Sequence, residues 1–350
     1  MEHRTLFSVT SRLLILGFVA AVLAVLVHPG APGSLTHPRP AHAAAAAPIL
    51  AAHNDTSTPF NLVSMPALIR HEYHGRGLRT RVITEGPDGT EYAVRYRSDG
   101  LTITGVMAVP RGSGPFPVVV LAHGFHTPTA YAVAPGVVAE RDWLVRRGYL
   151  VLQPDYRNYG GSTRESRRYV ARPTGYPADL VNAVLALRRA RLPYVARGPV
   201  NVFGRSMGGG VALQAIAAYP SLFRAAVLSS PLSSRAADNF RRWVRSDPAL
   251  RARVVDAYGP PRSNPAFWRA ASVRHYLSRV SVPVQLHHGT ADATCPVAWS
   301  EVTTRALRRQ DKRVALFEYS GQPHRFHAAA WRRMMQRTVR FFEGARAREG

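Results

Sequence analysis

From residue 118 onwards, short apolar segments alternate with longer segments of helical periodicity, and this alternation constrains the fold more than any other feature. The expected strands are 118–121, 149–153, 200–203, 225–228, 284–287 and 314–319. The expected helices are about 137–147, 179–189, 206–218, 296–310 and 328–343. Alternating strands and helices form βαβ units, because a parallel strand needs a crossover connection. The sequence therefore predicts an α/β fold with a mostly parallel, doubly wound sheet.

Two parts of the chain depart from the alternation. Three β-rich segments separated by the turn signals PDG and SDG predict an antiparallel N-terminal edge of the sheet; they are 80–84, 91–96 and 101–109. Residues 231–281 are polar, Arg-rich and helical. An insertion that follows the carboxyl end of a strand lies over the ligand crevice of an open α/β sheet. We interpret this segment as a small helical cap within a domain spanning 78–346.

The segment NVFGRSMGGG, residues 201–210, contains the pattern G-x-S-x-G with Ser206 between Gly204 and Gly208. An apolar strand precedes the pattern and a helix-forming run follows it, which is the setting of a nucleophile elbow. Glycines on both sides keep side chains clear of a serine held in strained backbone. The sequence therefore predicts the α/β-hydrolase fold, with Ser206 as the nucleophile.

In this fold the acid and the base follow the nucleophile along the chain. Asp292 lies in the loop after the next-to-last strand, where it would orient an imidazole by accepting its N–H. His324 lies in the loop after the last strand and is the expected base. Asp256, in the predicted cap, is the rival acid, and His327 is the rival base.

The predicted oxyanion hole has two backbone donors. One is the N–H of Met207, directly after the nucleophile, and the other is the N–H of Phe125 in the sequence AHGF. Gly124 allows the backbone to approach the substrate there. Such chemistry needs no metal or organic cofactor, and we expect none.

Three further residues near these loops are interpreted as structural. His287 and His288 lie on or beside the strand that carries the acid. Cys295, the single cysteine, has no nucleophile motif around it and is interpreted as a small apolar residue near a loop.

These motifs together resemble the catalytic domain of the prolyl oligopeptidase family. The resemblance covers roughly residues 90–345 and is carried by 98–110, 115–124, 155–162, 204–210, 288–292 and 321–326. It implies that Asp155 and Asp179 are loop and helix-cap residues rather than catalytic ones. The chain has no stretch long enough for the family's β-propeller before the first parallel strand, and it lacks an acidic motif for binding a peptide N-terminus. It therefore resembles the stand-alone members, often described as esterases.

The N-terminus has the pattern of a targeting segment. Arg4 and Arg12 precede an uncharged apolar run, 13–27, and an Ala-rich stretch follows. This predicts a signal peptide or signal anchor over 1–47, with the run 13–27 as a membrane tether in the second case. A linker is expected over 48–77. The enzyme is accordingly expected to be exported, either secreted or anchored to the outer face of the membrane.

The net charge of +25 comes almost entirely from arginine, since Lys312 is the only lysine. The arginines are scattered and form no long run, which favours a compositional origin over a nucleic-acid site. We predict a serine hydrolase acting on a small-molecule ester or a short peptide, with carboxylesterase-like activity preferred. The alternatives are an exported serine peptidase and a catalytically silent basic protein that binds the cell envelope.

Overall fold

The structure is a computed structural model that describes residues 64–127, 131, 137–165 and 175–348. The predicted signal segment 1–47 and most of the predicted linker lie outside the described residues. Within the described part, no helix is both long and apolar enough to cross a membrane.

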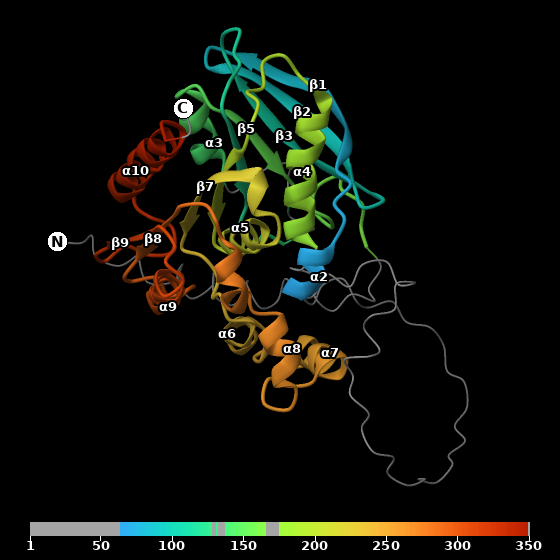
Figure 1. The fold of residues 1–350 in the computed structure, drawn as a ribbon, viewed down its shortest axis with the longest axis vertical. Helices are drawn as coiled ribbons and strands as arrows, with labels where there is room; N and C mark the ends of the chain where they lie inside the picture. The colour runs from blue at the N-terminus through green and yellow to red at the C-terminus, as the bar shows by residue number, and fades with distance from the viewer. Residues whose placement is uncertain (1–63, 128–130, 132–136, 166–174, 349–350) are drawn as a thin grey trace, which may run out of the picture. The chain divides into compact units, whose positions relative to one another are not determined.

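A nine-stranded sheet organises the chain, in the order β1-β2-β3-β5-β4-β6-β7-β8-β9 (Figure 1). The strands are β1(Arg76–Gly86), β2(Gly89–Ser98), β3(Leu101–Pro110), β4(Val118–Ala122), β5(Leu150–Pro154), β6(Val200–Arg205), β7(Phe223–Ser229), β8(Val284–Gly289) and β9(Val314–Tyr319). β1 to β3 pair antiparallel, β3 meets β5 antiparallel, and all later pairs are parallel. The predicted fold class, a mostly parallel sheet with an antiparallel N-terminal edge, is confirmed.

Helices cover both faces of the sheet (Figure 1). They are α3(Val138–Val145), α4(Tyr176–Ala190), α5(Met207–Ala218), α9(Val297–Arg308) and α10(Ala328–Arg346). Alternate residues of β4 face opposite ways, so Val118 and Val120 pack into the core beneath α4 and α5, whereas Val119 and Leu121 pack beneath α3 and α10. Burial on both faces explains why the central strands are uniformly apolar.

The folded domain begins earlier than the predicted boundary at residue 78. The helix α2(Met65–Arg70) starts at Ser64, whose side chain accepts the N–H of Ala67. Met65, Leu68 and Tyr73 are buried in the larger core. The linker prediction was therefore wrong for the residues from 64 onwards. The segment is too short to show a clear helical periodicity in the sequence, yet three buried apolar residues suffice to anchor it.

The predicted cap region, between β7 and β8, contains three α-helices, one short π-helix and one 3₁₀ helix. They are α6(Ala236–Asn239), η3(Phe240–Val244), α7(Pro248–Tyr258), α8(Pro265–Ala270) and η4(Val273–Arg279). Four residues form a small core of their own: Phe240, Val254, Tyr258 and Trp268. Arg242 of this region donates to the carbonyl oxygens of Ala293 and Thr294. The insertion thus contacts the loop that carries Asp292.

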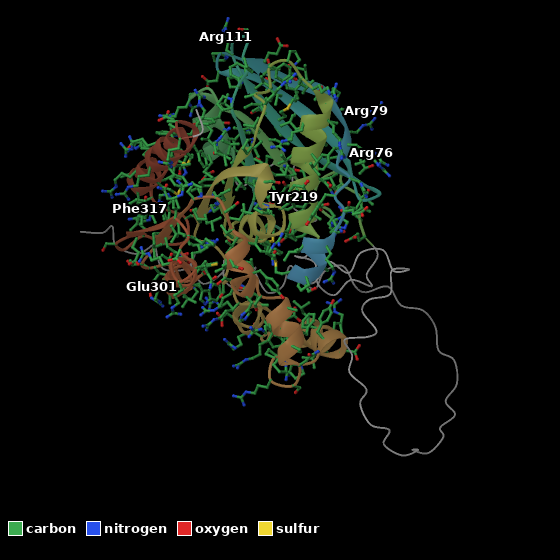
Figure 2. The ribbon with its side chains drawn as sticks, in the orientation of Figure 1. Arg76, Arg79, Arg111, Tyr219, Glu301 and Phe317 are labelled. Carbon is green, nitrogen blue, oxygen red and sulfur yellow. The ribbon has the colours of Figure 1, made fainter. Side chains whose placement is uncertain are left out.

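Basic side chains project from several elements. Arg76 and Arg79 extend outward from β1, and Arg111 follows β3 (Figure 2). Arg79 is paired across the strands with Arg95, and Arg76 with Arg97. Like charges directly opposite each other are unfavourable in a sheet, so these arginines add no stability through their pairing.

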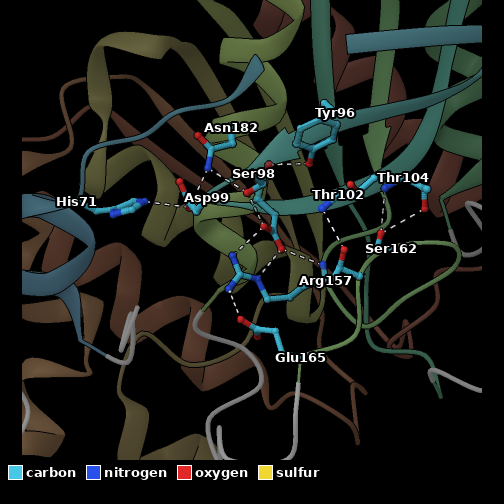
Figure 3. Close-up of polar contacts among 12 residues, drawn as sticks. His71, Tyr96, Ser98, Asp99, Thr102, Thr104, Arg157, Ser162, Glu165 and Asn182 are labelled. Carbon is cyan, nitrogen blue, oxygen red and sulfur yellow. Dashed lines mark hydrogen bonds and ion pairs between the residues drawn. The ribbon is translucent and has the colours of Figure 1, made fainter. Parts of the chain in front are cut away.

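A buried polar network joins the β2–β3 turn, the loop after β5 and α4 (Figure 3). The guanidinium of Arg157 donates to both carboxylate oxygens of Asp179 at 2.9 Å and to Glu165 at 2.9 Å. Asp179 also accepts from Ser98 at 2.7 Å. The interpretation of Asp179 as a helix cap was wrong: Gly175 is the N-cap of α4, and Asp179 lies in its first turn as the partner of Arg157.

We expect loss of one partner of this ion pair to destabilise the fold strongly. The side chains of Arg157 and Asp179 are 4% and 0% exposed, so R157M leaves a buried carboxylate without its counter-charge. The expected loss is about 3–5 kcal/mol in the free energy of unfolding, measured by urea denaturation. The control R305M breaks an exposed pair with Glu301 and is expected to cost about 0.5 kcal/mol or less. Equal losses in the two variants would contradict a structural role for the buried pair.

Candidate active site

Ser206 occupies a strained turn between β6 and α5. Its backbone has φ 57° and ψ −120°, a region that residues other than glycine rarely adopt. Its N–H donates to the carbonyl of Ser229 at 2.9 Å, which ties the turn to the end of β7. A Cβ on Gly204 would collide with the Gly208 carbonyl, and one on Gly208 with the Ala122 carbonyl. The two glycines of G-x-S-x-G therefore permit the close approach that keeps Ser206 at the tip of the turn.

The backbone beside Ser206 is suited to hold an oxyanion. Met207 is the first residue of α5, so its N–H has no partner within the helix. The loop after β4 lies alongside, since a Cβ on Gly124 would be 3.4 Å from the Cβ of Ser206. Phe125 follows directly in this loop, with its side chain 39% exposed. The structure thus brings the predicted donor loop and the predicted nucleophile together.

His123 anchors that loop. Its ring is fully buried, with Nδ1 2.7 Å from the carbonyl of Gly124 and Nε2 3.0 Å from the carbonyl of Asp155. Burial lowers the pKa of His123 to about 4, against the raising effect of these two carbonyls. The ring therefore links the ends of β4 and β5 beneath the candidate oxyanion hole.

Asp292 and His324 are in direct contact. His324 Nδ1 lies 2.7 Å from Asp292 Oδ2, and the two side chains are 20% and 0% exposed. The other oxygen, Oδ1, accepts the N–H groups of Thr294 and Cys295 at 2.8 Å each. A carboxylate can only accept, so Nδ1 carries the hydrogen and Nε2 of His324 is left as the basic nitrogen.

The carboxylate of Asp292 is held in its charged form. Burial raises its pKa, but hydrogen bonds from His288 and His324, with further donation from the Cys295 N–H, outweigh burial and bring the pKa below its usual range. Asp292 therefore remains ionised throughout the pH range in which a histidine titrates.

Cys295 connects the Asp292 turn to Ser206. Its thiol is wholly buried, and its side chain interacts with that of Ser206. Burial and the nearby Asp292 raise the pKa of the thiol well above its usual range, while the contact with Ser206 lowers it by less. The thiol therefore remains protonated.

The rival residues are both exposed. Asp256 is exposed on α7, and His327 is exposed at the start of α10, where its N–H donates to Gln322 Oε1 at 3.0 Å.

The interpretation of His288 and Cys295 as merely structural missed their contacts. His288 Nε2 lies 3.1 Å from Asp292 Oδ2, whereas the adjacent His287 bonds to Gln285 and Tyr319. The four-residue spacing from His288 to Asp292 is the only sequence signal of this contact. It becomes informative only once the chain is known to turn back after β8.

Comparison with known proteins places this arrangement in a family. The model of the prolyl oligopeptidase family matches residues 135–347. The uncharacterized peptidase YtmA of Bacillus subtilis (strain 168) is 24% identical over 258 residues, which cover 72% of this chain and 93% of YtmA.

Two solved structures share the fold. Acetyl xylan esterase from Paenibacillus sp. R4 has a TM-score of 0.61 at 20% identity, with 83% of this chain and 95% of the esterase covered. Acylaminoacyl peptidase from Pyrococcus horikoshii has a TM-score of 0.59 at 20% identity, with 77% of this chain covered. The chain spans only 42% of the length of that peptidase. From the match over most of its catalytic domain, the chain belongs to the prolyl oligopeptidase family and is a serine hydrolase.

Proposed function

We propose that the protein is a carboxylesterase-like hydrolase that forms an acyl-enzyme on Ser206. The observation that carries this proposal is the 2.7 Å contact between His324 Nδ1 and Asp292 Oδ2, which leaves Nε2 free to act as a base. The strained turn that presents Ser206 supports it. A hydroxyl alone is a weak nucleophile and needs such a base to take its proton.

The proposed reaction has two halves. His324 Nε2 takes the Ser206 proton as Oγ attacks the ester carbonyl, and the N–H groups of Met207 and Phe125 hold the resulting oxyanion. The tetrahedral intermediate collapses, and His324 delivers the proton to the departing alkoxide. Water then attacks the acyl-enzyme with the same base assistance and releases the acid. Asp292 stays ionised throughout and stabilises the imidazolium.

Esters are favoured over peptides as substrates because the described chain has no second domain beside the hydrolase domain. Between residue 64 and β4, the described chain has one short helix and an antiparallel three-stranded edge, with no second domain over the site. The likeness extends over 95% of the acetyl xylan esterase and over 93% of YtmA, whereas acylaminoacyl peptidase is more than twice as long as the matched part. Export of the enzyme, as expected from residues 1–47, would place such an esterase outside the cytoplasm.

A substrate comparison tests the proposal. We expect kcat/KM for p-nitrophenyl acetate to exceed that for aminoacyl p-nitroanilides by about tenfold or more, a barrier difference of roughly 1.4 kcal/mol. A preference for the anilides would favour the peptidase alternative. Failure of a fluorophosphonate to label Ser206, together with salt-sensitive retention on an anionic polymer, would favour the silent envelope-binding alternative.

A further inference from the structure

His288 makes three polar contacts from a wholly buried position at the end of β8. Nε2 lies 3.1 Å from Asp292 Oδ2 and 2.8 Å from the carbonyl oxygen of Cys295. Nδ1 lies 2.6 Å from the hydroxyl of Ser300, which is itself buried on α9. A single ring thus joins the strand, the Asp292 turn and the following helix.

The partners of the ring determine where its hydrogen lies. Both groups at Nε2 of His288 are acceptors, one a carboxylate and one a carbonyl, so Nε2 must carry a hydrogen. The hydroxyl of Ser300 can donate, and it does so to Nδ1 in the uncharged tautomer. The two acceptors at Nε2 therefore fix the tautomer, and the hydroxyl of Ser300 complements it by donating to Nδ1.

Asp292 is consequently held by four donors. The two backbone N–H groups bind Oδ1, and the imidazoles of His288 and His324 share Oδ2. Of these donors, only His288 also binds the carbonyl of Cys295, whose thiol contacts Ser206.

We propose that His288 is a positioning residue for the reaction. It holds the Asp292 carboxylate toward His324 and, through the carbonyl of Cys295, keeps the same turn against Ser206. This role rests on the proposed function, since it acts through Asp292 and His324 and does not touch substrate.

The direction in which removal of the His288 N–H shifts the pH profile of kcat/KM can be predicted. Without its N–H, more negative charge stays on Oδ2 of Asp292, and His324 holds its proton to higher pH. The acid limb of the kcat/KM profile then moves to higher pH. Other charged groups near these loops include Arg242, which binds the carbonyls of Ala293 and Thr294, and Glu318, which is exposed on β9. Arg325 follows His324 in the chain, and Arg205, which precedes Ser206, interacts with Arg325 electrostatically.

The neighbouring His287 supplies a matched control. It is equally buried, and its ring bonds to Tyr319 and Gln285 at 2.9 Å each, with neither partner in the proposed machinery. H287L and H288L therefore remove equal bulk from adjacent buried positions, with the loss of two polar contacts in H287L and three in H288L. Only H288L removes a donor from Asp292.

The experiment compares pH profiles of kcat/KM for p-nitrophenyl acetate between about pH 5 and pH 8, where histidine titrates. We expect H288L to lose about ten- to hundredfold in kcat and to move the acid limb upward. H288Q, whose amide N–H can replace Nε2–H, should recover much of both. H287L should leave the limb in place. If H288L does not fold, S300A carries the test, with a smaller upward movement expected.

Three outcomes overturn the role of His288: an unmoved acid limb in H288L or S300A, an equal movement in H287L, or no recovery in H288Q. Fluorophosphonate labelling of wild-type Ser206 is measured in parallel. Absent labelling rejects the proposed function itself, whereas normal labelling with an unmoved limb rejects only the role of His288.

Discussion

Replacing Ser206 with alanine is expected to lower kcat for p-nitrophenyl acetate by about 10⁴- to 10⁶-fold, because the acyl-enzyme can no longer form. The fold should survive. Alanine also has a Cβ, so the strained φ of 57° costs about the same, and the backbone bonds from Ser206 to Ser229 and Leu232 remain. Turnover, circular dichroism and the urea midpoint are measured on the same preparation.

Ser230 offers a matched control for that variant. It is buried, has a positive φ of 45° and also follows the carboxyl end of a strand. S230A should keep its turnover and its labelling by a fluorophosphonate, whereas S206A should lose both. Comparable turnover in S206A and the wild type would sink the assignment of the nucleophile.

Replacing Asp292 with asparagine is expected to lower kcat/KM by about 10⁴-fold at neutral pH. An amide can turn its N–H₂ toward Nδ1 of His324, which moves the ring hydrogen to Nε2. That nitrogen then cannot accept the proton of Ser206. The control D256N changes an exposed carboxylate on α7 and should leave kcat/KM unchanged. An equal loss in both variants, or none in D292N, would contradict the proposed role.

Asp292 also makes stability depend on pH. Its pKa is lower in the folded protein than in the unfolded chain, where an aspartate side chain has a pKa of about 3.9. The stabilising contribution of the charged form is therefore complete above that pH and is lost as the pH falls below it, toward the folded pKa. Urea titrations should show the stability difference between wild type and D292N shrinking as the pH drops below about 4.

Much of the fold could be predicted from local patterns. The strand–helix alternation located every strand from β4 to β9 to within a few residues, because burial on both faces requires continuous apolar runs. The G-x-S-x-G pattern placed Ser206 at a turn whose glycines are required by backbone contacts. Patterns failed where a segment was too short to show a period. The helix α2 is an example, because its few apolar residues gave no recognisable helical face.

The sequence by itself determined which residues end the strands, and therefore that Ser206, Asp292 and His324 lie in loops at one edge of the sheet. Only the tertiary structure decided which side chains in those loops touch. The contact of His288 with Asp292, that of Cys295 with Ser206, and the pairing of Arg157 with Asp179 depend on how neighbouring strands are aligned and how each loop turns. Local periodicity reports which face of an element is buried, whereas hydrogen-bond partners across loops are set by distances that only the packed sheet and helices establish.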